Sequence, residues 1–253
     1  MHYYVYILTV LLALSFPLSA KETLFVCTDD DNWFPYVYLE KKHKNEVKGI
    51  VVSLTKDIFK QLGYEAKYSA FPWLRCMEKL KNGSVDVVIA GTYTPERASY
   101  VHFPSDAHKM VDSEYVLARD PFVVITHRDN YFIYRGNDSE LPKPLRSQYG
   151  YNITNQLKNS GLPVEEYYSN KSALDDLVRS KTGSVLINRM SADNLLDDPK
   201  YGKHLHFNST PVRVSPYFIM FSKKSNKVGL NQREVFYQQI KAWRLQTGAG
   251  YVY

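Results

Sequence analysis

Short apolar runs alternate with amphipathic stretches along the first half of the chain. Thr23–Thr28, Glu65–Ala70 and Val85–Ile89 are rich in β-branched or aromatic residues and predict strands. Between the first two runs, apolar positions recur at helical spacing and stop at Gly63, a residue typical of helix C-termini. The face of this predicted helix consists of Val51, Leu54, Ile58, Phe59 and Leu62.

The second half repeats the pattern. Val164–Ser169 predicts a strand, Ala173–Arg179 a helix, and Gly183–Arg189 a buried strand that delivers polar residues at its end. Glu114–Ala118 and Pro121–Thr126 are also rich in strand-forming residues. Near the end, Tyr217–Ser222 predicts a strand and Val228–Leu245 an amphipathic helix with Phe236, Ile240 and Trp243 facing inward. The pattern therefore predicts two α/β units.

The stretch Ser84–Arg97, SVDVVIAGTYTPER, combines a buried strand, a turn of small residues and a helix start. Thr94 is a typical N-cap, Pro95 suits the first helical position, and Glu96 is favourable in the first turn. Free backbone N–H groups and the Arg97 guanidinium at this junction predict a site for a carboxylate or phosphate. The alternative is an ordinary junction with Arg97 in a surface ion pair.

This stretch resembles the motif of bacterial periplasmic solute-binding proteins of family 3, the receptors of polar amino-acid ABC importers. Asp86, Gly91, Thr94, Glu96 and Arg97 stand at matching positions, and the resemblance gives Arg97 the role of clamping the carboxylate of a ligand. It implies the two-lobed α/β fold of periplasmic binding proteins (type II), with two crossing strands, and hinge closure over a ligand that a membrane permease then recognises.

The resemblance also suggests a division of the chain. Residues 1–20 predict a signal peptide, since Val5–Leu14 is an apolar run of suitable length and Ser19-Ala20 offers a cleavage point; a buried first helix is the alternative. Lobe 1 is expected to comprise residues 21–118 and 222–253, and lobe 2 residues 119–221. We therefore expect a soluble, monomeric periplasmic protein.

Further ligand-binding candidates come from other resembling segments. The aromatic loop around Trp33 and Phe34 resembles a segment that stacks on the ligand, or else its rings pack beneath the loop, and Asp29–Asp31 could offer a carboxylate to a ligand cation. Phe71–Cys76 resembles a PWxR variant that places Trp73 and Arg75 at the rim of the cleft. The full set is Trp33, Phe34, Trp73, Arg75, Gly91, Thr92, Tyr93, Thr94, Arg97, Tyr151, Asn152, Asn188 and Arg189.

Arg189 departs from the family pattern. Amino-acid receptors have an Asp at the matching place, where it pairs with the ligand's α-ammonium, whereas this chain has Asn188 followed by Arg189. A guanidinium repels an ammonium and attracts a second anion. We therefore expect a ligand with a carboxylate and no obligatory α-ammonium, unless the ammonium partner lies elsewhere, for instance among Asp29–Asp31.

Composition narrows the remaining possibilities. The chain has 253 residues, a net charge of +6 and 23% charged residues without a basic run, which argues against nucleic-acid binding. Cys27 and Cys76 are predicted either to form a disulfide or to stay buried thiols. His204 and His206 are expected to face solvent rather than bind a metal, and no cofactor is expected. The expected partner is an ABC permease; alternatives are a membrane sensor or, for a dehydratase-like enzyme, catalysis by Asp29–Asp31, Glu96 or His108.

Overall fold

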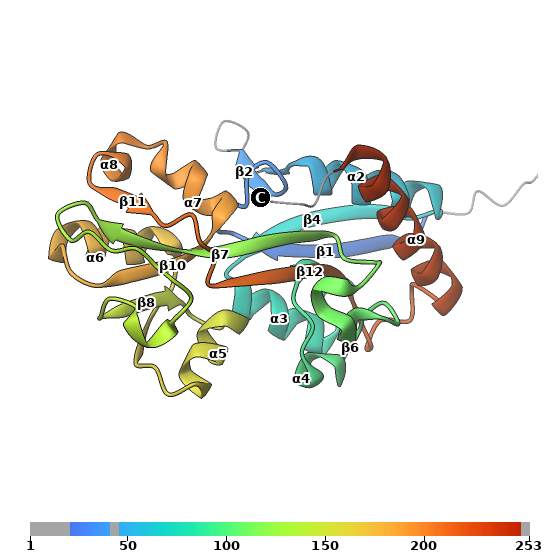
Figure 1. Ribbon diagram of the computed structural model, residues 1–253. Coiled ribbons are helices and arrows are strands. Elements are labelled where there is room, and N and C mark those ends of the chain that lie inside the picture. The colour runs from blue at the N-terminus through green and yellow to red at the C-terminus, as the bar shows by residue number, and fades with distance from the viewer. Residues whose placement is uncertain (1–20, 41–45, 249–253) are drawn as a thin grey trace, which may run out of the picture.

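The structure, a computed structural model, describes residues 21–40 and 46–248, and the predicted signal peptide lies outside these residues. Figure 1 shows two α/β halves side by side, with strands β7 (Ala118–His127) and β12 (Arg213–Ser222) running between them. The two crossing strands that the sequence predicts are therefore present. Among the described residues, no helix is long and apolar enough to span a bilayer.

The first half is a sheet with helices on both faces. Its strands follow the order β4-β1-β5-β12, with β1 parallel to β4 and β5, and β12 antiparallel to β5. Leu24 and Val26 face one core cluster together with α2 and α9, whereas Cys27 faces another with α3, because neighbouring residues in a strand point to opposite faces. The elements are β1 (Thr23–Asp29), β2 (Tyr38–Glu40), β3 (Glu46–Lys48), α2 (Ile50–Gln61), β4 (Glu65–Phe71), α3 (Trp73–Asn82), β5 (Val87–Gly91), α4 (Pro95–Ala98), β6 (Val101–His102), η2 (Ala107–Asp112) and α9 (Leu230–Thr247).

The second half continues the same sheet. The order β12-β7-β10-β8-β9 extends the path, with β8 parallel to β9 and β10, and β11 added on β7. One core cluster involves α6 and α7 and a second involves α5, again on opposite faces. The elements are η3 (Asp138–Glu140), β8 (Leu145–Gln148), α5 (Asn152–Asn159), β9 (Val164–Tyr167), α6 (Asn170–Ser180), β10 (Ser184–Asn188), α7 (Arg189–Leu196), α8 (Pro199–Gly202) and β11 (Leu205–Phe207).

Strand β12 joins the two halves into one sheet. Its residues 213–217 pair antiparallel with residues 118–122 of β7, and its residues 218–222 pair with β5 and β6. Of the stretch Glu114–Ala118, whose composition favours a strand, only Ala118 lies in β7; residues 114–117 precede it, and the N–H of Leu117 donates to the Tyr217 carbonyl at 2.7 Å. The lobe boundaries stay a prediction.

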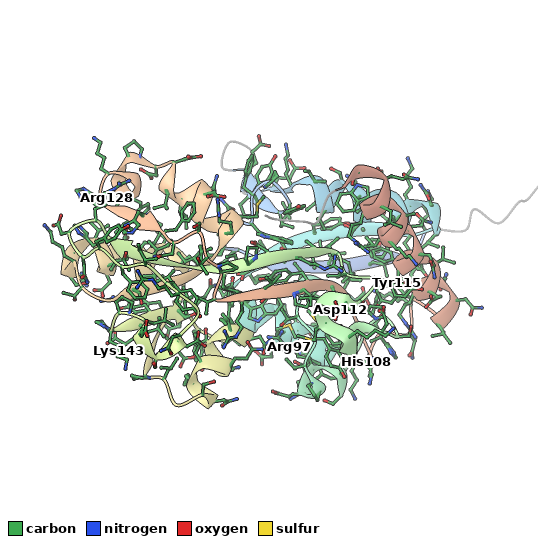
Figure 2. All side chains as sticks on the ribbon, in the orientation of Figure 1. Arg97, His108, Asp112, Tyr115, Arg128 and Lys143 are labelled. Carbon is green, nitrogen blue, oxygen red and sulfur yellow. A yellow bond between two sulfur atoms is a disulfide. The ribbon has the colours of Figure 1, made fainter. Side chains whose placement is uncertain are left out.

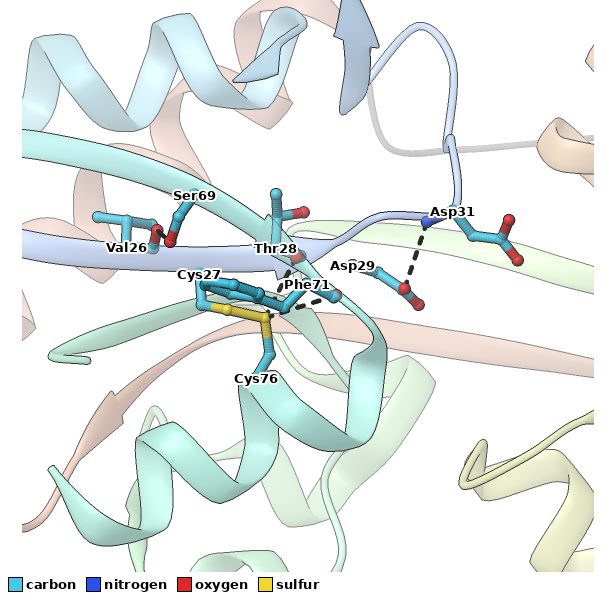
Figure 3. Close-up of a disulfide and its surroundings, with 8 residues drawn as sticks. All are labelled: Val26, Cys27, Thr28, Asp29, Asp31, Ser69, Phe71 and Cys76. Atoms are coloured by element: carbon cyan, nitrogen blue, oxygen red, sulfur yellow. Dashed lines mark hydrogen bonds between the residues drawn. A yellow bond between two sulfur atoms is a disulfide. The ribbon is translucent and has the colours of Figure 1, made fainter. Parts of the chain in front are cut away.

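A disulfide joins Cys27 of β1 to Cys76 in the first turn of α3, with the two Cα atoms 5.7 Å apart and both side chains inaccessible to solvent (Figure 3). Of the two possibilities that the sequence left open, a disulfide or two buried thiols, the structure has the disulfide. In Figure 3 the chain runs on from Cys27 through Thr28 to Asp29 and Asp31. The bond therefore fixes α3 beneath the strand end from which these carboxylates project.

Candidate functional site

A cavity of about 70 Å³ lies where the two halves meet. Strand ends and helix starts of both halves contribute to it, the arrangement in which α/β sheets commonly bind ligands. Five aromatic side chains form much of its wall, and hydroxyl, amide and charged groups complete it. The lining residues are Thr28, Asp29, Asp31, Trp33, Val37, Trp73, Ile89, Ala90, Thr92, Arg97, Phe122, Tyr151, Asn152, Ile153, Asn188, Ser191, Ser215 and Tyr217.

Arg97 is a buried cation in this cavity. Only 9% of it is exposed, its Nη1 donates to the Thr92 carbonyl at 3.0 Å and to Thr92 Oγ1 at 2.7 Å, and its guanidinium lies 5.2 Å from the centre of the Trp73 ring. Burial lowers the pKa of Arg97. Within residues 21–40 and 46–248, no carboxylate lies within salt-bridge distance of it. The guanidinium therefore remains available for an anion from outside.

Local sequence fixes the position of Arg97. Thr94 Oγ1 accepts the Arg97 N–H at 3.1 Å and Pro95 occupies the first helical position, as predicted. Helix α4 has only four residues, so the guanidinium rather than a helix N-terminus supplies the positive charge. Figure 2 places Arg97 between the two halves, whereas Arg128 and Lys143 lie far out on the half that contains β8 and α6.

Asp29 and Asp31 face the same cavity. Asp29 Oδ2 accepts the Tyr151 hydroxyl at 2.7 Å, and Asp29 Oδ1 accepts the Asp31 N–H at 3.3 Å. Burial and, second, the neighbouring Asp31 raise the pKa of Asp29 to about 8. Burial also raises the pKa of Asp31, although its carboxylate accepts the Asn170 N–H at the start of α6 at 2.9 Å.

A fully buried carboxylate, Asp120 of β7, lies next to the cavity wall. It accepts the Trp33 indole N–H at 2.7 Å and the Met190 N–H at the start of α7 at 3.4 Å. Its side chain has no solvent exposure, and burial raises its pKa to about 7. Asp120 therefore fixes the orientation of Trp33, which lines the cavity.

The loop after β1 holds the two halves together around the cavity. Besides the contacts of Asp29 and Asp31 with α5 and α6, the Ser191 hydroxyl of α7 donates to the Asn32 carbonyl at 3.1 Å. Residues 29–33 thus contact the starts of three helices of the second half. These contacts link the loop of the first half directly to the second half beside the cavity.

The structure brings seven of the thirteen predicted residues into the cavity: Trp33, Trp73, Thr92, Arg97, Tyr151, Asn152 and Asn188. The Trp73 indole nitrogen is buried without a hydrogen-bond partner among the described residues, and the Asn188 amide donates to the Tyr217 hydroxyl. The other six, Phe34, Arg75, Gly91, Tyr93, Thr94 and Arg189, are not among the lining residues.

Each of these six residues makes other contacts instead of lining the cavity. Phe34 is 46% exposed and packs on Tyr38, while Arg75 is exposed and lies over Phe71. Tyr93 packs against Phe103 and Thr94 caps α4. Gly91 faces the Met220 side chain, which a Cβ would overlap.

Arg189 forms a salt bridge with Asp193 at 3.0 Å and lies 4.2 Å from the centre of the Phe207 ring. A guanidinium engaged in this way does not present a second cation to the cavity. The expectation of a ligand without an ammonium group therefore loses its basis, and Asp29 and Asp31 are the groups suited to a cation.

Other lining residues did not come from sequence reasoning. Thr28 continues the alternation of β1 and could have been found from it. Phe122, Ser215 and Tyr217 lie where β7 and β12 pair, and a pairing between residues almost 100 positions apart carries no local signal.

Of the groups considered for catalysis, Asp29 and Asp31 line the cavity. Among the described residues, no group of three or more His, Cys, Asp and Glu could hold a metal ion. Glu96 and His108 are exposed and do not line the cavity, and Figure 2 shows His108 on the outer side of the first half. A buried guanidinium and two carboxylates in one cavity are complementary to a small solute that carries charges of both signs.

Comparison with known proteins agrees with this architecture. Residues 24–242 match the sequence model of the bacterial extracellular solute-binding proteins, family 3, whereas none of the curated proteins compared with the sequence matches it significantly. Holo ArgBP from T. maritima is 18% identical, with a TM-score of 0.69 and 88% of this chain and 90% of that chain covered.

Two other solved structures are comparably similar. A histidine kinase sensor domain with similarity to periplasmic binding proteins has a TM-score of 0.73 at 16% identity and covers 90% of this chain and 92% of its own. The ancestral amino-acid-binding protein AncCDT-1, a precursor of cyclohexadienyl dehydratase, has a TM-score of 0.65 at 19% identity. The match covers 89% of this chain and 91% of that chain. The two-lobed fold of periplasmic binding proteins is thereby confirmed, and the chain belongs to family 3 of the bacterial extracellular solute-binding proteins.

Proposed function

We propose that the protein is an exported periplasmic receptor that captures a small polar solute bearing a carboxylate, an amino acid or a related compound, and delivers it to an ABC importer. The observation that carries this proposal is the buried Arg97, which has no carboxylate partner among the described residues and shares one cavity with Asp29 and Asp31. Arg97 binds the carboxylate, and the two aspartates hold a cationic group of the same solute.

Closure of the two halves couples binding to recognition. A solute that contacts both Arg97 and the starts of α5 and α7 favours the closed state by its differential affinity for that state. A membrane permease that recognises only the closed form then responds to occupancy. No bond in the solute is made or broken.

Thermal denaturation of the mature protein with a panel of amino acids, dicarboxylates, amines and sugar acids tests the proposal. A binder at a hundred times its dissociation constant adds about 2.7 kcal/mol to the free energy of unfolding. A hit among amino acids or related carboxylates, recovered unchanged after incubation, supports reversible capture. Conversion of the hit to a product supports an enzyme instead, and silence across the panel contradicts the proposal.

A sensing role is the second candidate, supported by the similarity to a histidine kinase sensor domain. The same site serves both roles, so the partner decides between them. Uptake of the radiolabelled hit in cells with and without the gene separates the two. Loss of uptake supports the importer, whereas unchanged uptake with a lost transcriptional response supports the sensor.

A further inference from the structure

The cavity is lined by two carboxylates, Asp29 and Asp31, but by only one guanidinium, Arg97, among the described residues. This excess of acidic groups affects their protonation. Asp31 follows Asp29 closely in the same loop and donates its N–H to Asp29 Oδ1 at 3.3 Å. Among the described residues that line the cavity, Arg97 is the only basic one, and it is held on Thr92. Two neighbouring carboxylates without a cation between them favour retention of one proton.

The groups around Asp29 act in both directions. Besides burial, Asp31 and Asp30 of its own loop raise the pKa of Asp29, whereas the Tyr151 hydroxyl at the start of α5 donates to its carboxylate and lowers it; Tyr217 of β12 is a further titratable group near Asp29. The Asp31 carboxylate accepts the backbone N–H of Asn170 at the start of α6, and Asp30 is the charged group beside it. Burial raises the pKa of both carboxyls, that of Asp29 to about 8.

We infer that a proton on the Asp29–Asp31 pair takes the place of a ligand's ammonium group, so that pH selects between amino acids and carboxylates that lack the amine. When an ammonium enters, the O–H bond of the protonated carboxyl breaks, the proton passes to the buffer, and the resulting carboxylate pairs with the cation. When a solute without an amine enters, the proton stays. This inference rests on the proposed function and refines its ligand class.

The expected signature is a difference of one proton between matched ligands. Probe pairs that differ only in the α-amine are L-alanine and propionate, and L-arginine and 5-guanidinopentanoate. Between about pH 5.5 and 7.5 these amines and carboxylates keep their charges, so the ratio of the two dissociation constants changes about tenfold per pH unit in favour of the amino acid as pH rises.

Calorimetric titration of each pair, at several pH values and in buffers of different ionisation enthalpy, measures this ratio and the proton count. In Asp29→Asn the pH dependence of the ratio should disappear. The matched control is Asp30→Asn, an exposed aspartate of the same loop that does not line the cavity, which should retain it. A pair whose members both bind with a ratio independent of pH overturns the inference.

A second measurement needs no ligand. Carbon-13 NMR of the aspartate carboxyl groups, assigned with the Asp29→Asn and Asp31→Asn variants, reports whether one of the two is protonated in the free protein at pH 7. Both ionised at pH 7 overturns the inference. If the proton is present but no probe pair binds, the proposed function fails while the protonated pair stands.

Discussion

Arg97 is the only arginine or lysine among the described residues that line the cavity. Two of its donor interactions go to Thr92, which orients the guanidinium without neutralising it. The cost of burying an uncompensated guanidinium is offset only when an anion enters, so the residue is suited to function rather than to stability.

Replacing Arg97 by glutamine should weaken binding of a carboxylate ligand by about 2 kcal/mol or more, roughly thirtyfold, because a desolvated charge-assisted pair is lost. The matched control is Arg75→Gln, since Arg75 is exposed and lies over Phe71 away from the cavity. Calorimetric titration of both variants measures the difference. Equal affinities in two folded variants would remove Arg97 from the site.

Asp120 makes stability depend on pH. Its pKa is about 7 in the folded protein and near the ordinary value of 3.8 in the unfolded chain, so the folded state binds more protons between these values. The free energy of unfolding should therefore fall as pH rises from about 4 to 7, by up to about 1.4 kcal/mol per pH unit for this proton. Asp29, whose pKa is also raised, adds a fall of the same sign.

Urea unfolding of Asp120→Asn across this pH range should show a shallower fall, because asparagine still accepts the Trp33 indole N–H without binding a proton. The variant Asp57→Asn, on the exposed side of α2, reports the general effect of removing one negative charge. An unchanged slope in Asp120→Asn would mean that Asp120 is ionised in the folded protein throughout.

At the scale of elements, β5 carries backbone strain at the cavity wall. Ala90 has a φ of 66°, a left-handed conformation that costs a residue with a Cβ about 1–2 kcal/mol, and the register of β12 against β5 shifts between Phe218 and Met220, close to this position. The strained residue lines the cavity and precedes Gly91, whose hydrogen makes room for Met220.

Ala90→Gly should therefore raise the free energy of unfolding by about 0.5–1 kcal/mol, the relief of strain exceeding the greater freedom of glycine in the unfolded chain. Ala70→Gly in β4, where φ is not positive, should lower it by a similar amount. Denaturant midpoints of the two variants measure these shifts. A loss of stability in both would contradict strain at Ala90.

At the scale of single elements, some features of the structure can be predicted from local sequence and others cannot. Strand, turn and cap signals within Ser84–Arg97 are contiguous, so they predicted both α4 and the placement of Arg97. For Arg189 the family resemblance pointed to a ligand contact, whereas a local signal, an aspartate four residues later at the spacing of a helical ion pair, points to the salt bridge that the structure contains. The environments of Asp29, Asp31 and Asp120 depend on α5, α6 and α7 respectively, far away in sequence, and no local pattern encodes them.

At the scale of the whole molecule, the Cys27–Cys76 disulfide closes a loop with a sequence separation of 49. A cross-link of this span stabilises a fold by about 4 kcal/mol in the chain-entropy model. The double variant Cys27→Ala/Cys76→Ala should lose about that much stability in denaturant unfolding. Equal stability of the variant and of the oxidised wild type would show that the cross-link contributes nothing.

The fold itself was predictable because alternating strands and helices leave few arrangements, and the family resemblance selected among them. The cavity could not be predicted from the sequence in the same way, because its shape depends on how the two halves meet. Seven of the predicted residues lie there because strand ends and helix starts of both halves converge, a property of the fold rather than of the individual side chains.

Both strands that connect the halves carry a proline inside their mutual ladder, with Pro121 opposite Val214 and Pro216 opposite Arg119. Each proline removes one backbone donor from a strand in the middle of the sheet. At these two positions the halves are therefore joined by fewer backbone donors than a proline-free pair of strands could supply, and the contacts of residues 29–32 around the cavity provide further links between them.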